Sequence, residues 1–240
     1  FNDNYAEYRG GAIKIDSYGA ASVINSIFTN NRVTKSTGSN HGGAIYSVSE
    51  EGIEVRNSYF ENNEVPYLGA AIYLDNDGAD VIENCTFKNN TGNYGAINAE
   101  NTKVTIKDSK FSDNNGNNGA ADVIMNSDDS SIANCDFKNS YGGGNGGSIN
   151  WAGNNGQLSD STFTNCIAAV LSSAGAVYWS GNNGEISKSE FKNNKAFDSG
   201  AIRLYGDDVT VKDSKFTNNT ASLNGGAIDI DGINDKIINC

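Results

Sequence analysis

Closely spaced carboxylates are the first residues in this chain that could do chemistry. Asp75 and Asp77 flank an asparagine and precede a glycine, which is the spacing of part of a calcium-binding loop. The distal glutamate of such a loop is missing, so solvated turn acids are the simpler interpretation and a weakly bound surface calcium ion is the alternative. Carboxylates about 5 to 9 Å apart could also hydrolyse glycosides, but stacked repeats bring acids that close without any catalytic purpose.

Histidine and cysteine, which serve nucleophilic and zinc chemistry, are scarce. The only histidine, His41, precedes a glycine, and nothing in the sequence supplies the carboxylate that Ser-His-Asp catalysis needs. The four cysteines, Cys85, Cys135, Cys166 and Cys240, include no CxxC pair, so we expect free thiols rather than a zinc site. We therefore predict that the protein is not an enzyme and has no cofactor other than the weak calcium candidate.

Aromatic side chains are the best candidates for binding a ligand. Trp151 and Trp179 stand at equivalent places in the near-duplicate segments WAGNNG and WSGNNG, and they should stack. Their column also contains Ile15, Leu74, Val123, Leu204 and Ile230, so burial in the core is the alternative. Tyr46, Tyr73 and Tyr178 share a second column, with Lys14, Asn98, Asp122, Asn150, Arg203 and Asp229, that we expect to face outward. These five aromatic residues are our predicted contacts for a ligand.

The element that must position these residues is an internal repeat of 24 to 32 residues. Nine of the ten phenylalanines share one column, at Phe1, Phe28, Phe60, Phe87, Phe111, Phe137, Phe163, Phe191 and Phe216. Two residues after each stands Asp or Asn, and the asparagines are Asn30, Asn62, Asn89, Asn139, Asn165, Asn193 and Asn218. A second motif, GGAI or a variant of it, sits in every period.

Strands this short cannot bury a core alone, so each period must stack on the next. A turn of about 25 residues at roughly 3.3 Å each suits a three-sided parallel coil, and parallel crossovers are right-handed. The sequence therefore predicts an all-β fold, a right-handed parallel β-helix of about eight to nine coils. We expect residues 1–240 to form a single such domain, an excerpt of a longer repeat protein.

Two columns rich in asparagine should mark corners of the coil. The aliphatic residue five positions before each phenylalanine and the phenylalanine itself cannot both face inward on one straight strand, because strand side chains alternate. We expect a bend at the Asn or Asp three residues before each phenylalanine, a pattern that only Lys188 breaks. The column two residues after each phenylalanine should form a ladder of stacked amides, with phenylalanine stacked on phenylalanine inside.

The tandem pattern of FxNN followed by GGAI resembles the polymorphic outer-membrane proteins of Chlamydia and the adhesin-like surface proteins of methanogenic archaea. The likeness is carried by Phe28, Asn31 and Gly42 to Ile45, by Phe60 and Asn63 with Gly69 to Ile72, and by Phe216, Asn219 and Gly225 to Ile228. It spans the whole chain and implies a pectin-lyase-like β-helix on a cell surface, with adhesion as the family role. The motifs are structural signatures and do not specify a ligand.

Composition and charge limit the fold and the kinds of molecule that the protein is expected to bind. The chain has 37 asparagines, 28 glycines and one proline, which excludes an all-helical fold. A net charge of −12 repels phosphate backbones, so nucleic acid is not an expected partner, and no apolar run is long enough to span a membrane. We expect an extracellular adhesive rod that contacts glycans, cell-surface proteins or identical rods. The alternative is a polysaccharide lyase or glycoside hydrolase on the same scaffold.

Overall fold

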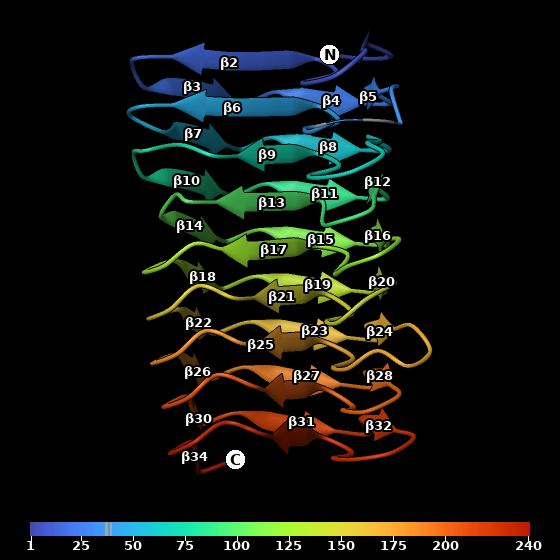
Figure 1. Cartoon of the computed structure of the whole chain (residues 1–240), viewed down its shortest axis with the longest axis vertical. Coiled ribbons are helices and arrows are strands. Elements are labelled where there is room, and N and C mark those ends of the chain that lie inside the picture. Colours follow the sequence, from blue (N-terminus) through green and yellow to red (C-terminus); the bar gives the residue numbers. More distant parts are fainter. Residues whose placement is uncertain (37, 39) are drawn as a thin grey trace.

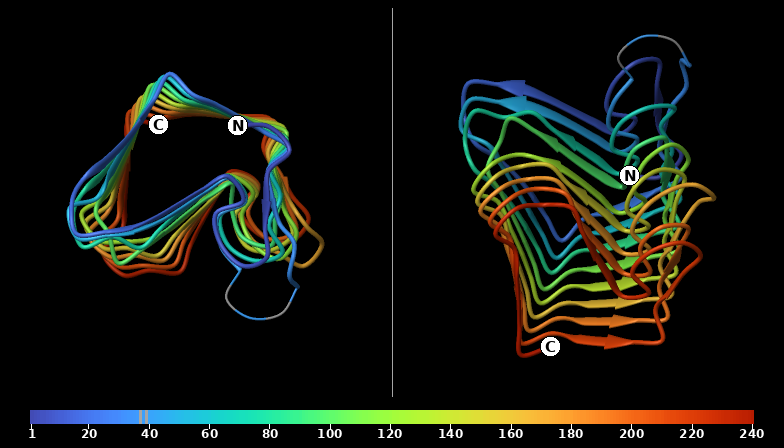
Figure 2. Two further views of the ribbon diagram at one scale, coloured as in Figure 1. Left: turned by 90° about the horizontal axis from the view of Figure 1, so that it is seen from above. Right: turned by 60° about the horizontal axis from the view of Figure 1, so that its bottom comes forward.

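The computed structural model describes residues 1–36, 38 and 40–240 as a stack of short strands, one coil above the next (Figure 1). Seen along the rod, three sides enclose a core and a smaller lobe projects beside them (Figure 2). The strand pairs of the described residues are all parallel, and each pair links one coil to the next. The predicted parallel β-helix is therefore confirmed.

The first side, which we call the GGAI sheet, begins in each coil at the end of that motif. Its nine strands are β2 (Ile13–Ser17), β6 (Ile45–Ser49), β9 (Ile72–Leu74), β13 (Ile97–Glu100), β17 (Val123–Asn126), β21 (Ile149–Trp151), β25 (Val177–Trp179), β29 (Ile202–Leu204) and β33 (Ile228–Ile230).

The second side, the aliphatic sheet, contains the aliphatic column that precedes each phenylalanine. Its nine strands are β3 (Ala21–Ile24), β7 (Ile53–Arg56), β10 (Asp80–Glu83), β14 (Val104–Lys107), β18 (Ser131–Ala133), β22 (Gln157–Ser159), β26 (Glu185–Ser187), β30 (Thr210–Lys212) and β34 (Lys236–Ile238).

The third side, the phenylalanine sheet, has eight strands. They are β4 (Ile27–Thr29), β8 (Tyr59–Glu61), β11 (Thr86–Lys88), β15 (Lys110–Ser112), β19 (Asp136–Lys138), β23 (Thr162–Thr164), β27 (Glu190–Lys192) and β31 (Lys215–Thr217). Its phenylalanine rings stack along the axis with centroids 4.6 to 5.0 Å apart, and Phe28 to Phe191 in this column are at most 1% exposed. Burial of each ring stabilises the fold by about 1.5 to 3 kcal/mol.

The lobe lies between the phenylalanine sheet and the GGAI sheet. Its strands are β1 (Tyr5–Ala6), β5 (Arg32–Val33), β12 (Thr91–Gly92), β16 (Asn115–Gly116), β20 (Tyr141–Gly142), β24 (Ile167–Ala168), β28 (Lys195–Ala196) and β32 (Thr220–Ala221). Single-residue bridges through Glu64 connect β5 to β12, so the lobe runs along the rod beside the three sides.

Left-handed backbone makes the corners. The residues three before each phenylalanine from Phe28 to Phe216 have φ between 48° and 53°, and Lys188 shares this conformation at 48° although it is neither Asn nor Asp. Asn and Asp reach this region at lower cost than other residues with a side chain, which explains their column. The predicted bend is confirmed at every one of these positions.

The predicted amide ladder is present on the outside of the rod. Asn62 donates to Asn30 at 3.2 Å, and Asn89 donates to Asn62 at 2.6 Å. The same contacts link Asn139, Asn165 and Asn193. Asn218 has the same left-handed backbone, with φ of 52°, but in the described residues no side-chain hydrogen bond joins it to Asn193. Asn218 therefore shares the corner conformation of this column, and its membership of the ladder stays a prediction.

A second ladder, which we did not predict, lies one residue further on and is buried except at Asn219, which is half-buried. Its members are Asn31, Asn63, Asn90, Asn114, Asn194 and Asn219. Each amide from Asn31 to Asn90 donates to the next asparagine and to the carbonyl of a phenylalanine in the preceding coil. Ser140 and Cys166 replace asparagine in this column, so the ladder is interrupted in the middle of the rod.

The two glycines of the GGAI motif are required for different structural reasons. Gly42 has φ of 69°, a left-handed turn in which a side chain would also strike the carbonyl of Ile45. Gly43 has an ordinary backbone, but a Cβ there would lie 2.0 Å from the carbonyl oxygen of Ala70 in the next coil. The first glycine therefore permits the turn, and the second permits the coils to approach.

One coil differs from the register that we predicted. Asn98 pairs with Ile124, not with Asp122, and Trp151 pairs with Met125, not with Val123. Asp122 instead stands in the inward alanine column, beside Ala96, and is fully buried. This coil lacks a regular GGAI motif, so its columns were set two residues out of place.

Candidate functional site: the outer face of the GGAI sheet and the lobe

The tryptophan pair does not face solvent, which corrects its assignment as a ligand contact. Trp151 and Trp179 stack with centroids 4.4 Å apart and are both 0% exposed. Gly156 and Gly184, the last residues of the near-duplicate segments, make room for them, because a Cβ on either would lie 2.5 Å from the indole ring. The duplicated motif therefore describes a packing unit in the core.

Tyr46 and Tyr73 do lie on the outer face of the GGAI sheet, but the lobe covers them. They are 6% and 5% exposed, and their rings stack 5.3 Å apart. His41 of the lobe stacks on Tyr73 at 4.2 Å. Burial raises the pKa of both phenols. These two tyrosines therefore join the lobe to the sheet and offer no open face to a ligand, contrary to our prediction.

Tyr178 is the most accessible of the three predicted tyrosines. It is half-buried and stacks against Tyr205 of the next coil at 6.4 Å, and Tyr205 is 58% exposed. Arg203, on the same face, pairs with Asp198 of the lobe and with Asp229 and Asp231 of the last coil. This end of the face therefore retains an aromatic contact surface with a neutralised cation beside it.

The calcium candidates lie at the edge of the GGAI sheet, where its outer face meets the turn to the aliphatic sheet. Asp75 accepts a hydrogen bond from Asn101 at 3.1 Å, and Asp77 is exposed. Both line a pocket of about 290 Å³ together with Asp16 and Glu50. Among the residues described by the structure, no three acidic, histidine or cysteine side chains converge as a metal site would require. Calcium at Asp75 and Asp77 remains a prediction without a completed set of ligands.

His41 is held in its neutral form. Burial, and secondarily the nearby Arg9, lower its pKa to about 4. Arg9 lies with its guanidinium carbon 5.0 Å from the centroid of the Tyr46 ring. The histidine thus packs in an aromatic cluster with Tyr46, Tyr67 and Tyr73.

A buried carboxyl group lies where the second, buried asparagine ladder (the inner ladder) is interrupted at Ser140. Asp122 accepts hydrogen bonds from Asn114 at 2.8 Å, from Ser148 at 2.7 Å and from Ser140 at 2.5 Å. Burial raises its pKa to about 6 even though these bonds oppose the shift. Asp122, Ser140 and Ser148 all depart from the repeat, so these departures compensate one another. The cluster does not reach solvent and is structural.

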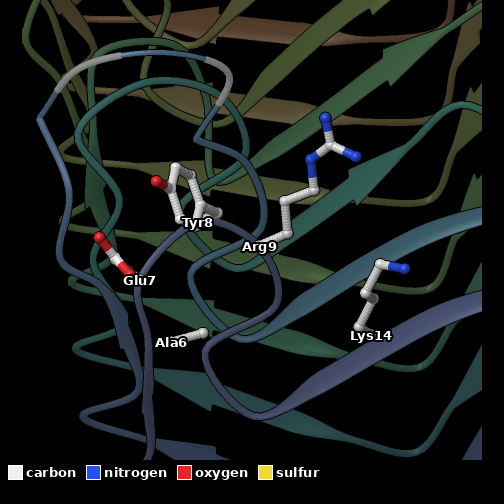
Figure 3. A pocket seen from close by; sticks show the side chains of 5 residues that line it. All are labelled: Ala6, Glu7, Tyr8, Arg9 and Lys14. Carbon is white, nitrogen blue, oxygen red and sulfur yellow. The ribbon is translucent and has the colours of Figure 1, made fainter.

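The first coil carries an open pocket that the sequence did not reveal to us. It has a volume of about 580 Å³ and is lined by Ala6, Glu7, Tyr8, Arg9 and Lys14 (Figure 3). The first four belong to the lobe and Lys14 to β2, so the pocket lies where the lobe meets the GGAI sheet. Arg9 was visible in the sequence as one of four arginines, but the repeat pattern did not place it at a pocket.

Comparison with known families agrees with this architecture. The model of the family described as "right handed beta helix region" matches residues 1–145 and again residues 95–240, which together cover the whole chain. The chain belongs to this family. No curated protein and no solved structure matches this β-helix significantly.

The described residues of this β-helix include no helix long and apolar enough to cross a membrane. All four of its cysteines are free thiols, with Cys240 exposed and the other three buried. The backbone N–H of Cys85 donates to the hydroxyl of Ser109 in the next coil, and that of Cys135 donates in the same way to Ser161. The coil that contains Ser109 therefore lies between the two thiols.

Proposed function

We propose that this β-helix is an extracellular recognition rod, an adhesin or adhesive stalk, and that it acts by contact rather than by catalysis. The observation that carries the proposal is the exposure of tyrosine. Six of the eleven tyrosines are at least 43% exposed: Tyr5, Tyr8, Tyr18, Tyr67, Tyr141 and Tyr205. Tyrosine combines a large apolar face with a polar hydroxyl and loses little conformational entropy on binding, which makes it a common contact residue.

The scaffold supports this role physically. Stacked phenylalanines join each coil to the next, and two amide ladders reinforce part of the rod, so the tyrosines project from a stiff support. The net charge of −12 favours solubility of an exposed rod. Partners of this kind are glycans or proteins on other cells, or identical rods.

The proposal is tested by cell and glycan binding of the fluorescently labelled protein. A variant with Tyr5, Tyr8, Tyr67 and Tyr141 replaced by serine should lose most of its binding while it keeps the parent melting temperature. A control with the buried Tyr46 replaced by phenylalanine should bind normally. In parallel, acidic and neutral polysaccharides are screened for cleavage. Turnover that disappears with a single carboxylate substitution would overturn the proposal in favour of a lyase or hydrolase.

A further inference from the structure

The loop after β24 carries an apolar tip on the outside of the lobe. Its tip residues, Val170 and Leu171, are 85% and 76% exposed, and the loop projects beyond the neighbouring coils (Figure 1). Leu171 has φ of 70°, a left-handed conformation that Asn, Asp or Gly adopts at almost every other such position of the described chain. Leucine reaches this conformation at a cost, and strained backbone of this kind is concentrated at contact sites. The tip is therefore a candidate contact with a partner.

The base of the loop is fixed by hydrogen bonds. The N–H of Ser172 donates to the carbonyl of Ala169 at 3.0 Å, and the carbonyl of Ser172 accepts from the N–H of Phe197 at 3.3 Å. The hydroxyl of Ser173 donates to the carboxylate of Asp198 at 3.3 Å. The tip is thus held in one position, so little conformational entropy is lost when a partner covers it.

An apolar pocket of about 350 Å³ lies beside this loop. Its lining comes from the neighbouring strands β20, β24 and β28, from the loop itself and from the turn after β32, so the pocket lies on the flank of the rod. Phe197, the one phenylalanine outside the ladder, is part of this lining. The larger lining residues are Tyr141, Ile167, Val170, Lys195 and Phe197.

The pocket is free of the negative charge that dominates this protein. Its one charged lining residue is Lys195, and no Asp or Glu is among the lining residues that the structure describes. Elsewhere the net charge of −12 makes two copies repel each other. At this pocket a second copy meets a lysine and an apolar surface, so this is where one acidic rod can approach another.

We propose that the loop tip and the pocket form a two-fold contact between two copies of this chain, in which Val170 and Leu171 of each copy enter the pocket of the other. A two-fold contact requires one surface to carry both a projection and the recess that accepts it. Here the projection and the recess are adjacent, because Val170 belongs to both. The inference rests on the proposed function, which includes identical rods among the partners, and deepens it by naming the surface that joins them.

The contact should be weak. The pocket and the loop tip involve far fewer residues than the roughly 20 to 30 per partner of a standard interface. We therefore expect a Kd between about 1 μM and about 1 mM. Rods that stand side by side on one surface are concentrated there, so a weak contact is enough to join them.

Sedimentation equilibrium tests the contact over this concentration range, with reducing agent present because Cys240 is an exposed thiol. The average mass of the parent should rise toward twice that of the monomer and stop there, since a two-fold contact closes. Val170→Ser with Leu171→Asn, the tip variant, should raise the Kd at least about tenfold, and asparagine suits the left-handed backbone. Ile24→Thr with Ile27→Thr, which removes two exposed aliphatic side chains from β3 and β4, should have no effect.

A mixing experiment tests the exchange itself. Ser222→Trp fills the pocket from an exposed lining position and should weaken the association of that variant alone. The filled copy retains its loop tip, and the tip variant retains its pocket. A mixture of the two variants should therefore associate more tightly than either variant alone, because one of the two contacts is restored.

Any of four results would overturn the inference: the parent stays monomeric up to about 1 mM, its mass grows past that of a dimer, the tip variant associates as the parent does, or the mixture associates no more tightly than its components. Should the tip variant be less stable than the parent, Ser222→Trp carries the test and must weaken association. If the tip variant dimerises normally while the tyrosine variant loses cell binding, the contact is wrong and the recognition function stands. If the dimer forms through this pocket but no cell or glycan is bound, recognition of other cells fails and the contact stands.

Discussion

Asn63 donates a hydrogen bond from Nδ2 to Oδ1 of Asn90, one coil further along the rod, at 3.0 Å. Both side chains are 0% exposed. The same Nδ2 also donates to the carbonyl of Phe28 at 3.0 Å, and Oδ1 of Asn63 accepts from the backbone and side chain of Asn31. Every polar atom of this amide thus has a partner within the protein.

Asn63→Asp should destabilise the protein by at least about 3 kcal/mol. Aspartate puts an acceptor where an amide donated, so Phe28 O loses its side-chain donor, and Asn90 Oδ1 keeps only the backbone N–H of Asn63 and faces a second carboxylate oxygen. Urea denaturation measures the loss. Asn62→Asp is the matched control, because Asn62 lies next to Asn63 in the exposed ladder and Asp113 already occupies an equivalent corner with φ of 57°. It should change stability by less than about 1 kcal/mol. Equal losses in the two variants would show that the inner ladder has no special role.

Lys188→Asn should stabilise the protein by about 0.5 to 1 kcal/mol. Lys188 has φ of 48° in the corner that asparagine or aspartate occupies in the other coils, and a lysine in this conformation is strained. The new amide could also bond to Asp160 of the preceding coil, as Asn134 bonds to Asp108 at 2.6 Å. The shift in denaturation midpoint is compared with that of Lys192→Asn, an exposed strand position where asparagine should bring no gain. A neutral or harmful Lys188→Asn would contradict the strain argument.

The protein should be more stable at pH 5 than at pH 8. Burial raises the pKa of both Asp122 and Asp80 from an ordinary 3.8 to about 6. A group whose pKa is raised by folding stabilises the native state fully below its unfolded pKa, and that contribution is lost as pH rises through the folded pKa. The loss therefore falls between about pH 4 and pH 7 and amounts to roughly 2 to 3 kcal/mol for each group.

Asp122→Asn isolates the part of this pH dependence that comes from Asp122. The amide has the same shape as the carboxyl group and no charge. The stability of the variant, measured as the urea midpoint from pH 4.5 to pH 8, should therefore change less with pH than that of the parent. Asp128→Asn, an exposed acid, is the control and should retain the parent profile. A parent protein that is most stable above pH 7 would rule out protonation of the two buried acids.

Only one of the four thiols should react in the native protein. Burial raises the pKa of Cys85 to about 11 and that of Cys135 to about 12, and it also raises the pKa of Cys166, so these three stay protonated and inaccessible. Cys240 is exposed. A coloured disulfide reagent should therefore titrate one thiol in buffer and four in denaturant. Reducing agent should leave the melting temperature unchanged, whereas a marked fall would reveal a disulfide and a wrong column assignment.

The sequence by itself determined the β-helix and its regular columns. A residue that recurs every 24 to 32 positions in the chain recurs once per coil in space, so Phe111 stacks on Phe137 and Asn84 forms a corner simply because the repeat is regular. The backbone preference of asparagine and aspartate and the stacking of identical side chains are enough to predict the corner and the phenylalanine stack. Lys188 was also recognisable in the sequence as an exception to the Asn or Asp column.

Only the tertiary structure decided which side chains are accessible. Trp151 is buried because Gly156 leaves space for its ring, and Tyr73 is covered because His41 of the lobe stacks on it. The place of Asp122 depended on three polar partners spread over 35 residues of sequence, from Asn114 to Ser148. Column patterns report which residues are equivalent, but exposure depends on how irregular segments fold over the sheets. Those contacts join residues of different columns, so periodicity carries no information about them.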